Sequence, residues 1–330
     1  MALSKIQGIE GQVTPNLGRR NMLINGDFQV WQRGTSGTVN TYTCDRWFGW
    51  GYQQALTRQA ADGTSQNDGR FGLRVQHNDG TANQFSSIAQ TLETADTGKA
   101  RGKKLTFSID AKKGSAFTGN LTIQIVTRTD AQGSINTGTR QVLVTEDVTS
   151  SLTTSMKRFT CTTTSTVSQD AKVVGVNVNH TGTTGTDANN YFQVERAQLE
   201  IGDTATDFEH PVFGQEIQLC KRYFQRISGF KQGAYSPCMI AYSTTAAQGT
   251  LHLQTTMFST PSVSLEGAGL KLEDGGAGYP TSSTTFAGQV GSENHINFWI
   301  GGFSGLTDGN AYYCYGDDAN HYIDLSAEVG

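Results

Sequence analysis

Three aromatic residues near the C-terminal end of the sequence have types and spacing suited to binding a sugar. Trp299 lies in one strand-like segment, and Tyr313 and Tyr315 lie in another, two positions apart and therefore on one face of a strand. An aromatic ring offers a flat apolar surface to the C–H face of a sugar, and the indole N–H and phenol O–H add polar handles. These residues are candidate carbohydrate contacts; the alternative is that they pack the core of a small β domain.

A second aromatic group lies nearer the N-terminal end. Trp50 and Tyr52 are two positions apart, so a strand would place both rings on one face, where they could also bind a sugar. Trp47 lies in the same segment, and we expect its ring to lie in the core. The first cluster remains the better candidate, because it lies toward the end of the chain that we expect to be outermost.

No pattern in the sequence indicates catalysis. Glycoside hydrolysis needs two carboxylates about 5 to 10 Å apart, and no spacing of acidic residues marks such a pair. The sequence has no GxSxG nucleophile motif, no phosphate-binding loop and no HExxH zinc motif. Its 5 cysteines include no CxxC pair. We therefore expect no catalytic residues, no metal-binding residues and no enzyme activity.

The elements that must position these aromatic residues are predicted to be short β-strands. The chain has 330 residues, of which 39 are Gly and only 16% are charged, and a helical protein would be richer in charged residues and Ala. Residues 105–111 alternate cleanly, with Leu105, Phe107, Ile109 and Ala111 on one face. Similar segments recur up to residue 200, separated by Gly, Asn, Asp and Thr, which predicts a two-sheet β-sandwich.

One segment breaks the strand pattern. Between residues 215 and 227, Ile217, Cys220, Phe224 and Ile227 recur at helical spacing, which predicts a single linking helix. Strand-like segments then return, and they predict a second, smaller β-sandwich. The fold class expected is therefore all-β, with a β-sandwich, a linking helix and a second β-sandwich.

Charge and hydropathy exclude two classes of partner. The net charge of −4 gives no general attraction for nucleic acid. No stretch approaches the ~20 apolar residues of a membrane-spanning helix. The first residues lack the apolar core of a secretory signal, so we expect the protein to be made in a cytoplasm without being exported by that route.

Three parts of the sequence together resemble a known class of protein. They are residues 21–34 (NMLINGDFQVWQRG) with residues 42–47 (YTCDRW), residues 197–210 (AQLEIGDTATDFEH) and residues 219–224 (LCKRYF). In this order they resemble the tail-fibre and related surface proteins of bacteriophages and prophages. The first two parts resemble the opening and closing strands of a jelly roll like that of carbohydrate-binding modules. The resemblance covers residues 21–228 and extends only loosely beyond them.

The resemblance implies an organisation and a function. Residues 1–20 would be an arm that docks on other virion proteins, residues 21–210 the jelly roll, residues 211–228 the linking helix and residues 229–330 a C-terminal β domain. The protein would be a homotrimeric virion component, assembled in the host cytoplasm. It would act as a tail-fibre or receptor-binding subunit that contacts a host cell-surface glycan. The alternative is a head-decoration or head-fibre subunit with a mainly structural role.

Carbohydrate-binding modules with this opening often carry a structural calcium ion. In them an acidic residue follows the aromatic residue of the first strand, whereas this sequence has Gln29 there, and a neutral amide is a poorer ligand for a hard cation. Asp27 and Asp45 could still supply oxygen atoms. No cofactor is expected, with structural calcium as the alternative.

Overall fold

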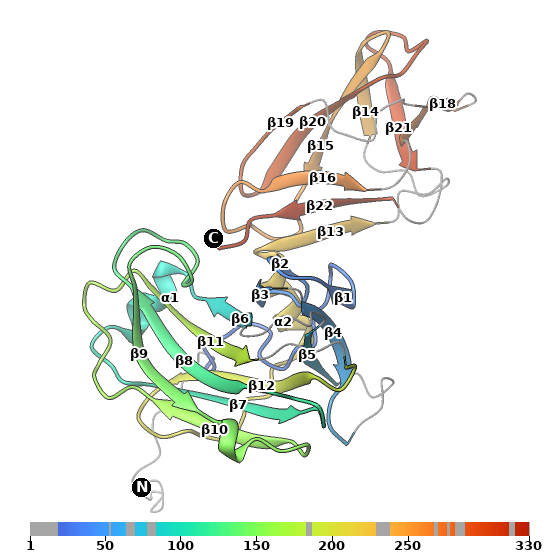
Figure 1. The fold of residues 1–330 in the computed structure, drawn as a ribbon. Helices are drawn as coiled ribbons and strands as arrows, with labels where there is room; N and C mark the ends of the chain where they lie inside the picture. Colours follow the sequence, from blue (N-terminus) through green and yellow to red (C-terminus); the bar gives the residue numbers. More distant parts are fainter. Residues whose placement is uncertain are drawn as a thin grey trace, which may run out of the picture.

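The computed structural model contains two β-sandwich regions joined by a short helical segment (Figure 1). It describes residues 19–52, 54–63, 70–77, 84–182, 187–228, 238–266, 270–275, 278–280, 288–316 and 321–329. Nearly all of the regular structure is antiparallel β-sheet, so the all-β fold class is confirmed. Within these residues, no helix is both long and apolar enough to cross a membrane.

Two six-stranded sheets form the first region, a jelly-roll β-sandwich. Sheet I has the order β1 (Ser36–Gly37), β4 (Gln54–Ala60), β5 (Phe71–His77), β12 (Tyr191–Ile201), β7 (Leu105–Lys113) and β10 (Lys157–Thr162). Sheet II has the order β2 (Thr41–Tyr42), β3 (Phe48–Gly51), β6 (Gln84–Thr91), β11 (Val173–Gly182), β8 (Asn120–Arg128) and β9 (Arg140–Asp147).

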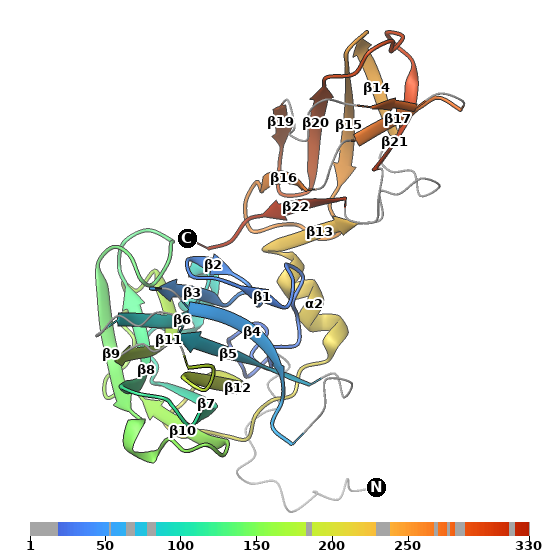
Figure 2. The same ribbon diagram turned by 45° about the vertical axis from the view of Figure 1, so that its right-hand side comes forward.

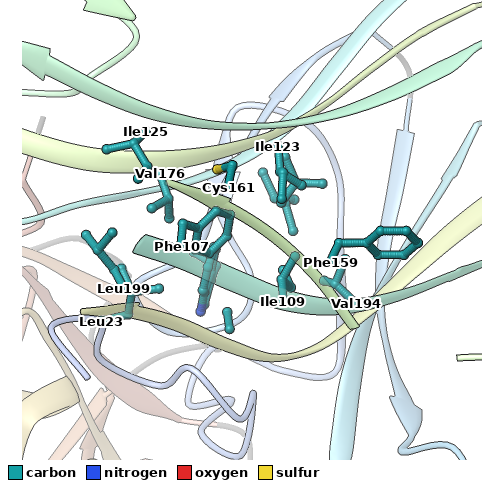
Figure 3. Packing of buried hydrophobic residues seen from close by; sticks show 14 of the residues in the cluster. Leu23, Phe107, Ile109, Ile123, Ile125, Phe159, Cys161, Val176, Val194 and Leu199 are labelled. Atoms are coloured by element: carbon teal, nitrogen blue, oxygen red, sulfur yellow. The ribbon is translucent and has the colours of Figure 1, made fainter. Parts of the chain in front are cut away.

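The core of this sandwich lies between the two sheets (Figure 3). The predicted apolar face of β7 is confirmed, because Leu105, Phe107 and Ile109 all pack in this core, although both faces of the strand are buried. They face Ile123 and Ile125 of β8, which belong to the opposite sheet. Burying one such side chain contributes roughly 1.5–3 kcal/mol. The period-two pattern thus places one continuous apolar layer inside the sandwich.

The helical content differs from the prediction in two ways. The linking helix α2 covers only Phe213–Lys221, and Phe224–Ser228 forms strand β13. Every residue of β13 pairs with strand β22. The apolar spacing of Phe224–Ser228 also fits a helix, but the hydrogen bonds to β22 hold the segment in a strand. A second helix, α1 (Thr94–Ala100), was missed, because it is short and buries only Thr97 and Ala100. One 3-10 turn, η2, covers Thr149–Ser151.

Two more antiparallel sheets form the C-terminal region. Sheet III has the order β13, β22 (Tyr322–Ser326) and β16 (Ser262–Glu266). Sheet IV has the order β18 (Gly278–Pro280), β17 (Leu270–Glu273), β21 (Ala311–Gly316), β14 (Cys238–Ser243), β15 (Ala246–His252), β20 (His295–Gly301) and β19 (Gly288–Gly291). Their facing side chains form a separate apolar core. Sheet III lies between the jelly roll and sheet IV in both views (Figure 2).

Ion pairs connect the jelly roll to sheet III and to the segment that leads into it. Glu328 follows β22 and forms ion pairs with Arg33 at 3.0 Å and with Arg46 at 2.5 Å. At the C-terminal end of α2, the guanidinium group of Arg222 donates hydrogen bonds to both carboxylate oxygens of Glu93, at 2.6 and 3.0 Å. These side chains come from opposite sides of the boundary, and they hold the two regions in a defined arrangement.

Candidate functional site

The outward face of sheet IV carries two of the five predicted site residues, Trp299 and Tyr313. Along β14 the side chains alternate, so that Met239 and Ala241 are buried in the core while Cys238, Ile240 and Tyr242 face outward. Ile240 is 50% exposed and Tyr242 is 46% exposed. Because neighbouring strands share the same pleat, the outward residues of β15, β20 and β21 lie on the same face.

The register of the strands brings polar and aromatic groups together. Trp299 of β20 lies opposite Gln248 of β15, which in turn lies opposite Ile240 of β14. In the next row Asn297 lies opposite Thr250. A groove of about 690 Å³ runs over this part of the sheet, and it is lined by Cys238, Ile240, Gln248, Gly249, Thr250, Asn297, Phe298 and Trp299.

The polar groups of the groove can both donate and accept hydrogen bonds. The hydroxyl of Thr250 donates to Oδ1 of Asn297 at 2.7 Å, which fixes the orientation of the amide and leaves its NH₂ group as a donor. Gln248 is exposed and offers a second amide. None of the residues that line this groove carries a charge. The lining therefore suits a neutral ligand rich in hydroxyl groups.

Tyr313 lies on the same face, toward the other edge of the sheet. It is 53% exposed and pairs with Cys238 of β14. Trp299 and Tyr313 are three strands apart, which is about 14–15 Å at the usual spacing between strands. The structure thus brings two of the three predicted C-terminal contacts to one surface, at either side of the groove.

Tyr315 has to be removed from the predicted site. It is only 5% exposed, although it has the same strand parity as Tyr313. It pairs with the half-buried Lys271 of β17, near the end of its strand. Parity gives the direction of a side chain but not the neighbours that cover it. The ring of Tyr315 therefore has no face open to a ligand.

The N-terminal pair lies on a different surface. Trp50 belongs to β3 and is 38% exposed, and its ring contacts Phe85 edge-on with centroids 5.5 Å apart. Tyr52 is 61% exposed but lies just beyond the strand, because Gly51 has a φ of +132°. Trp47 is fully buried, as expected. Trp50 and Tyr52 are thus exposed on the jelly roll, apart from the sheet IV face.

Sequence reasoning missed several residues of this face, among them Ile240, Tyr242, Gln248, Thr250 and Asn297. The alternation of residues 238–242 marked a strand, and the same alternation places Ile240 and Tyr242 opposite the core residue Met239. The amides had no signal of their own, because only the pairing of β15 with β20 brings them beside Trp299.

The residues considered as calcium ligands form no calcium site among the residues that the structure describes. Both carboxylate oxygens of Asp45 are already bonded, one to Arg33 at 3.1 Å and one to Gln32 at 3.0 Å. Asp27 and Gln29 line a cavity of about 440 Å³ together with two more acidic residues, Asp62 and Glu195, and two basic ones, Arg70 and Arg196, so the lining has mixed charge. Burial is the main cause that raises the pKa of Asp27 to about 7, which makes it a weak ligand for a hard cation.

The described residues contain no group of three or more His, Cys, Asp and Glu that could hold a metal ion. The fold and the sheet IV face define a two-part β-sandwich protein with an exposed aromatic and amide surface. No family model matches the sequence, and no curated protein matches it either.

Comparison with solved structures finds similar β-sandwich folds. A family 4 carbohydrate-binding module is 18% identical, with a TM-score of 0.34, over 54% of this chain and 98% of that one. A family 22 carbohydrate-binding module from Clostridium thermocellum is 14% identical, with a TM-score of 0.32, over 51% and 94%. The enzymatically active domain of tailspike protein 4 of bacteriophage CBA120 is 10% identical, with a TM-score of 0.35, and the match spans 56% of this chain and 22% of that one. These likenesses concern the shape of the sandwich alone.

Proposed function

We propose that this protein is a structural component of a bacteriophage-type particle, a tail-fibre or receptor-binding subunit that binds a host cell-surface polysaccharide. The observation that carries the proposal is the outward face of sheet IV. There Trp299 and Tyr313 flank a groove whose polar groups are amides and a hydroxyl. We assign this surface a binding role, without chemistry of its own.

The chemistry of the groove supports a glycan rather than a peptide or an anion. Sugar rings stack their apolar C–H faces on aromatic rings, while the hydroxyl groups need partners that both donate and accept. Gln248, Thr250 and Asn297 are such partners, and they lie in adjacent rows beside Trp299. An uncharged lining supplies no cation for a phosphate or carboxylate group.

The separation of the two aromatic residues favours a polymer. A span of about 14–15 Å across three strands exceeds the width of one sugar ring, so Trp299 and Tyr313 would contact different residues of one chain. Sheet IV also lies on the far side of sheet III from the jelly roll (Figure 2). If residues 1–20 dock on the particle, this face is the outermost surface of the subunit.

Repetition around a particle axis would strengthen a weak contact of this kind. We place the three copies of a homotrimer around the start of α2, where Val212 is 65% exposed and Phe213 is 57% exposed. Three glycan-binding faces on one trimer would bind a polymer with higher avidity than a single face.

Binding of purified protein to polysaccharide extracted from host cells tests the proposal. The wild-type protein should bind, and Trp299→Ala should bind at least tenfold more weakly with an unchanged Tm. Tyr52→Ala is the matched control, because this exposed aromatic residue lies on the jelly roll. Absence of wild-type binding to any host glycan would overturn the proposal and leave the head-decoration role.

A further inference from the structure

Two buried histidines meet inside one end of the jelly roll, next to the apolar core. His77 ends β5 of sheet I, and His180 lies near the end of β11 of sheet II. Both side chains are completely buried, and their ring centroids are 4.2 Å apart. The proposed glycan site uses neither residue, so this cluster needs its own explanation.

The hydrogen bonds of the two rings define where their lone pairs lie. Nε2 of His180 is 2.6 Å from the carbonyl oxygen of Thr118, which can only accept, so Nε2 carries the proton and Nδ1 has the lone pair. Nε2 of His77 is 3.1 Å from the hydroxyl of Ser86, and with the proton on that nitrogen its Nδ1 also has a lone pair. Burial lowers the pKa of both rings. Both Nδ1 atoms are buried without a hydrogen-bond partner.

Two amide oxygens in the same place are also without a partner. Gln54 pairs with His77 in the register of β4 and β5, and its Oε1 is buried and unpaired. Its NH₂ group donates to the carbonyl of Trp50 at 3.2 Å, which fixes the orientation of the amide. Asn190 accepts the backbone N–H of His77 through its own carbonyl at 3.1 Å, and its buried Oδ1 is unpaired.

Nδ1 of His180 and the two amide oxygens are acceptors, and Nδ1 of His77 is a fourth when its Nε2 donates to Ser86; none of the four has a hydrogen-bond partner among the described residues. Native proteins rarely leave a buried acceptor unsatisfied, so unpaired acceptors at one end of the sandwich favour an electron-poor partner. A cation meets that requirement, as does a small group of water molecules. Donation of the second ring N–H to a carbonyl or hydroxyl is also the usual arrangement of histidines that bind a metal.

We propose that this cluster binds a divalent transition-metal ion, with Nδ1 of His77 and Nδ1 of His180 as nitrogen ligands and the amide oxygens of Gln54 and Asn190 as oxygen ligands. Imidazole nitrogen selects zinc, copper or nickel over calcium and magnesium. Of the four proposed ligands, only the two histidines are of the types that usually bind metal ions. The two neutral amides supply the remaining ligand atoms. A bound ion would join β5 of sheet I to β11 of sheet II and stabilise this end of the sandwich.

The full-length protein, treated with chelator and then dialysed, provides the test. Titration with ZnCl₂, NiCl₂ or CuCl₂ in separate experiments should show one bound ion per chain by calorimetry and elemental analysis. It should also raise Tm, because an ion that binds only the folded state stabilises it. His180→Gln should lose the stoichiometric binding, whereas His252→Gln, which changes an exposed histidine of β15, should keep it.

A second variant keeps the test decisive if the histidine variants fail to fold. Asn190→Asp places a carboxylate among the ligands, so it should raise the affinity for the metal at least tenfold. If only water occupies the space between the four side chains, Asn190→Asp would bury an unpaired charge. The Tm would then be lower both with and without added metal. Equal metal uptake by wild type and His180→Gln, or no stoichiometric uptake by wild type, overturns the proposal.

Discussion

Arg46 and Glu328 form an ion pair at 2.5 Å that joins the jelly roll to the segment after the last strand of sheet III. Both side chains are nearly inaccessible, at 2% and 7% exposure. The guanidinium group of Arg46 also lies 3.5 Å from the ring centroid of Tyr223, which follows α2. One arginine of the jelly roll therefore contacts both chain segments that lead into the C-terminal region.

Replacing Glu328 should destabilise the protein strongly. Glu328→Ala leaves the buried Arg46 without its carboxylate, and breaking a buried pair typically costs about 3–5 kcal/mol. Urea unfolding should show this loss, together with a separate transition for the C-terminal region. Glu146→Ala, on the exposed strand β9, is the control and should change stability by less than about 0.5 kcal/mol. A single unfolding transition of Glu328→Ala at the wild-type urea concentration would show that this ion pair does not stabilise the contact between the two regions.

Two tyrosines of one strand should respond oppositely to the same change. Tyr313→Ala should weaken polysaccharide binding by about 2 kcal/mol, or thirtyfold, and leave Tm unchanged. Tyr315→Ala removes a buried ring and should lower stability by roughly 3–5 kcal/mol. Paired binding and melting measurements check both expectations. Normal binding by a stable Tyr313→Ala protein would remove Tyr313 from the site.

Stability should decrease as the pH rises toward 8, because of Asp27. Burial, followed by the nearby carboxylate of Glu216, raises the pKa of Asp27 from 3.8 to about 7. Between these values the folded state binds more protons than the unfolded state, so stability is greatest at low pH within this window and decreases through pH 7. Asp27→Asn should reduce this dependence and raise Tm at pH 8. Asp203→Asn, on an exposed side chain, should leave the profile unchanged.

The oligomer should depend on the exposed apolar residues at the start of α2. Phe213→Asp should convert the homotrimer to monomers in light scattering, because it places a charge in the proposed contact. Phe224 is unsuitable for this test, since it is buried within the subunit with Arg33 3.7 Å from its ring centroid. Gln215→Asp, on the same helix, is the control. A monomeric wild-type protein would end the proposal.

Short-range patterns predicted the sandwich, but they could not predict every boundary. The alternation of Leu105, Phe107 and Ile109 follows from the pleat itself, so the buried face of β7 was visible in the sequence. The strand at residues 224–228 was not visible in the sequence, because its conformation depends on pairing with β22, almost a hundred residues away. Local spacing carries no information about such a partner.

The candidate site shows the same limit. The exposure of Tyr313 and the burial of Tyr315 differ although their spacing predicts one common face and both pair with β17, because strand parity gives the direction of a side chain but not the neighbours that cover it. The paired arrangement of Asn297 and Thr250 depends on the register of β15 and β20. Aromatic residues therefore indicated the region, and only the strand pairing identified the surface.

The central position of β22 in sheet III sets the order in which the protein can be made. β13 and β16 do not pair with each other, and each pairs with β22, which follows both of them in the sequence. The jelly roll can fold while translation continues, since all its strands precede residue 202. Sheet III has to wait until Ser326 has been synthesised. A chain stopped a few codons early would thus present two unpaired strand edges, which chaperones and proteases recognise, and would be removed before assembly.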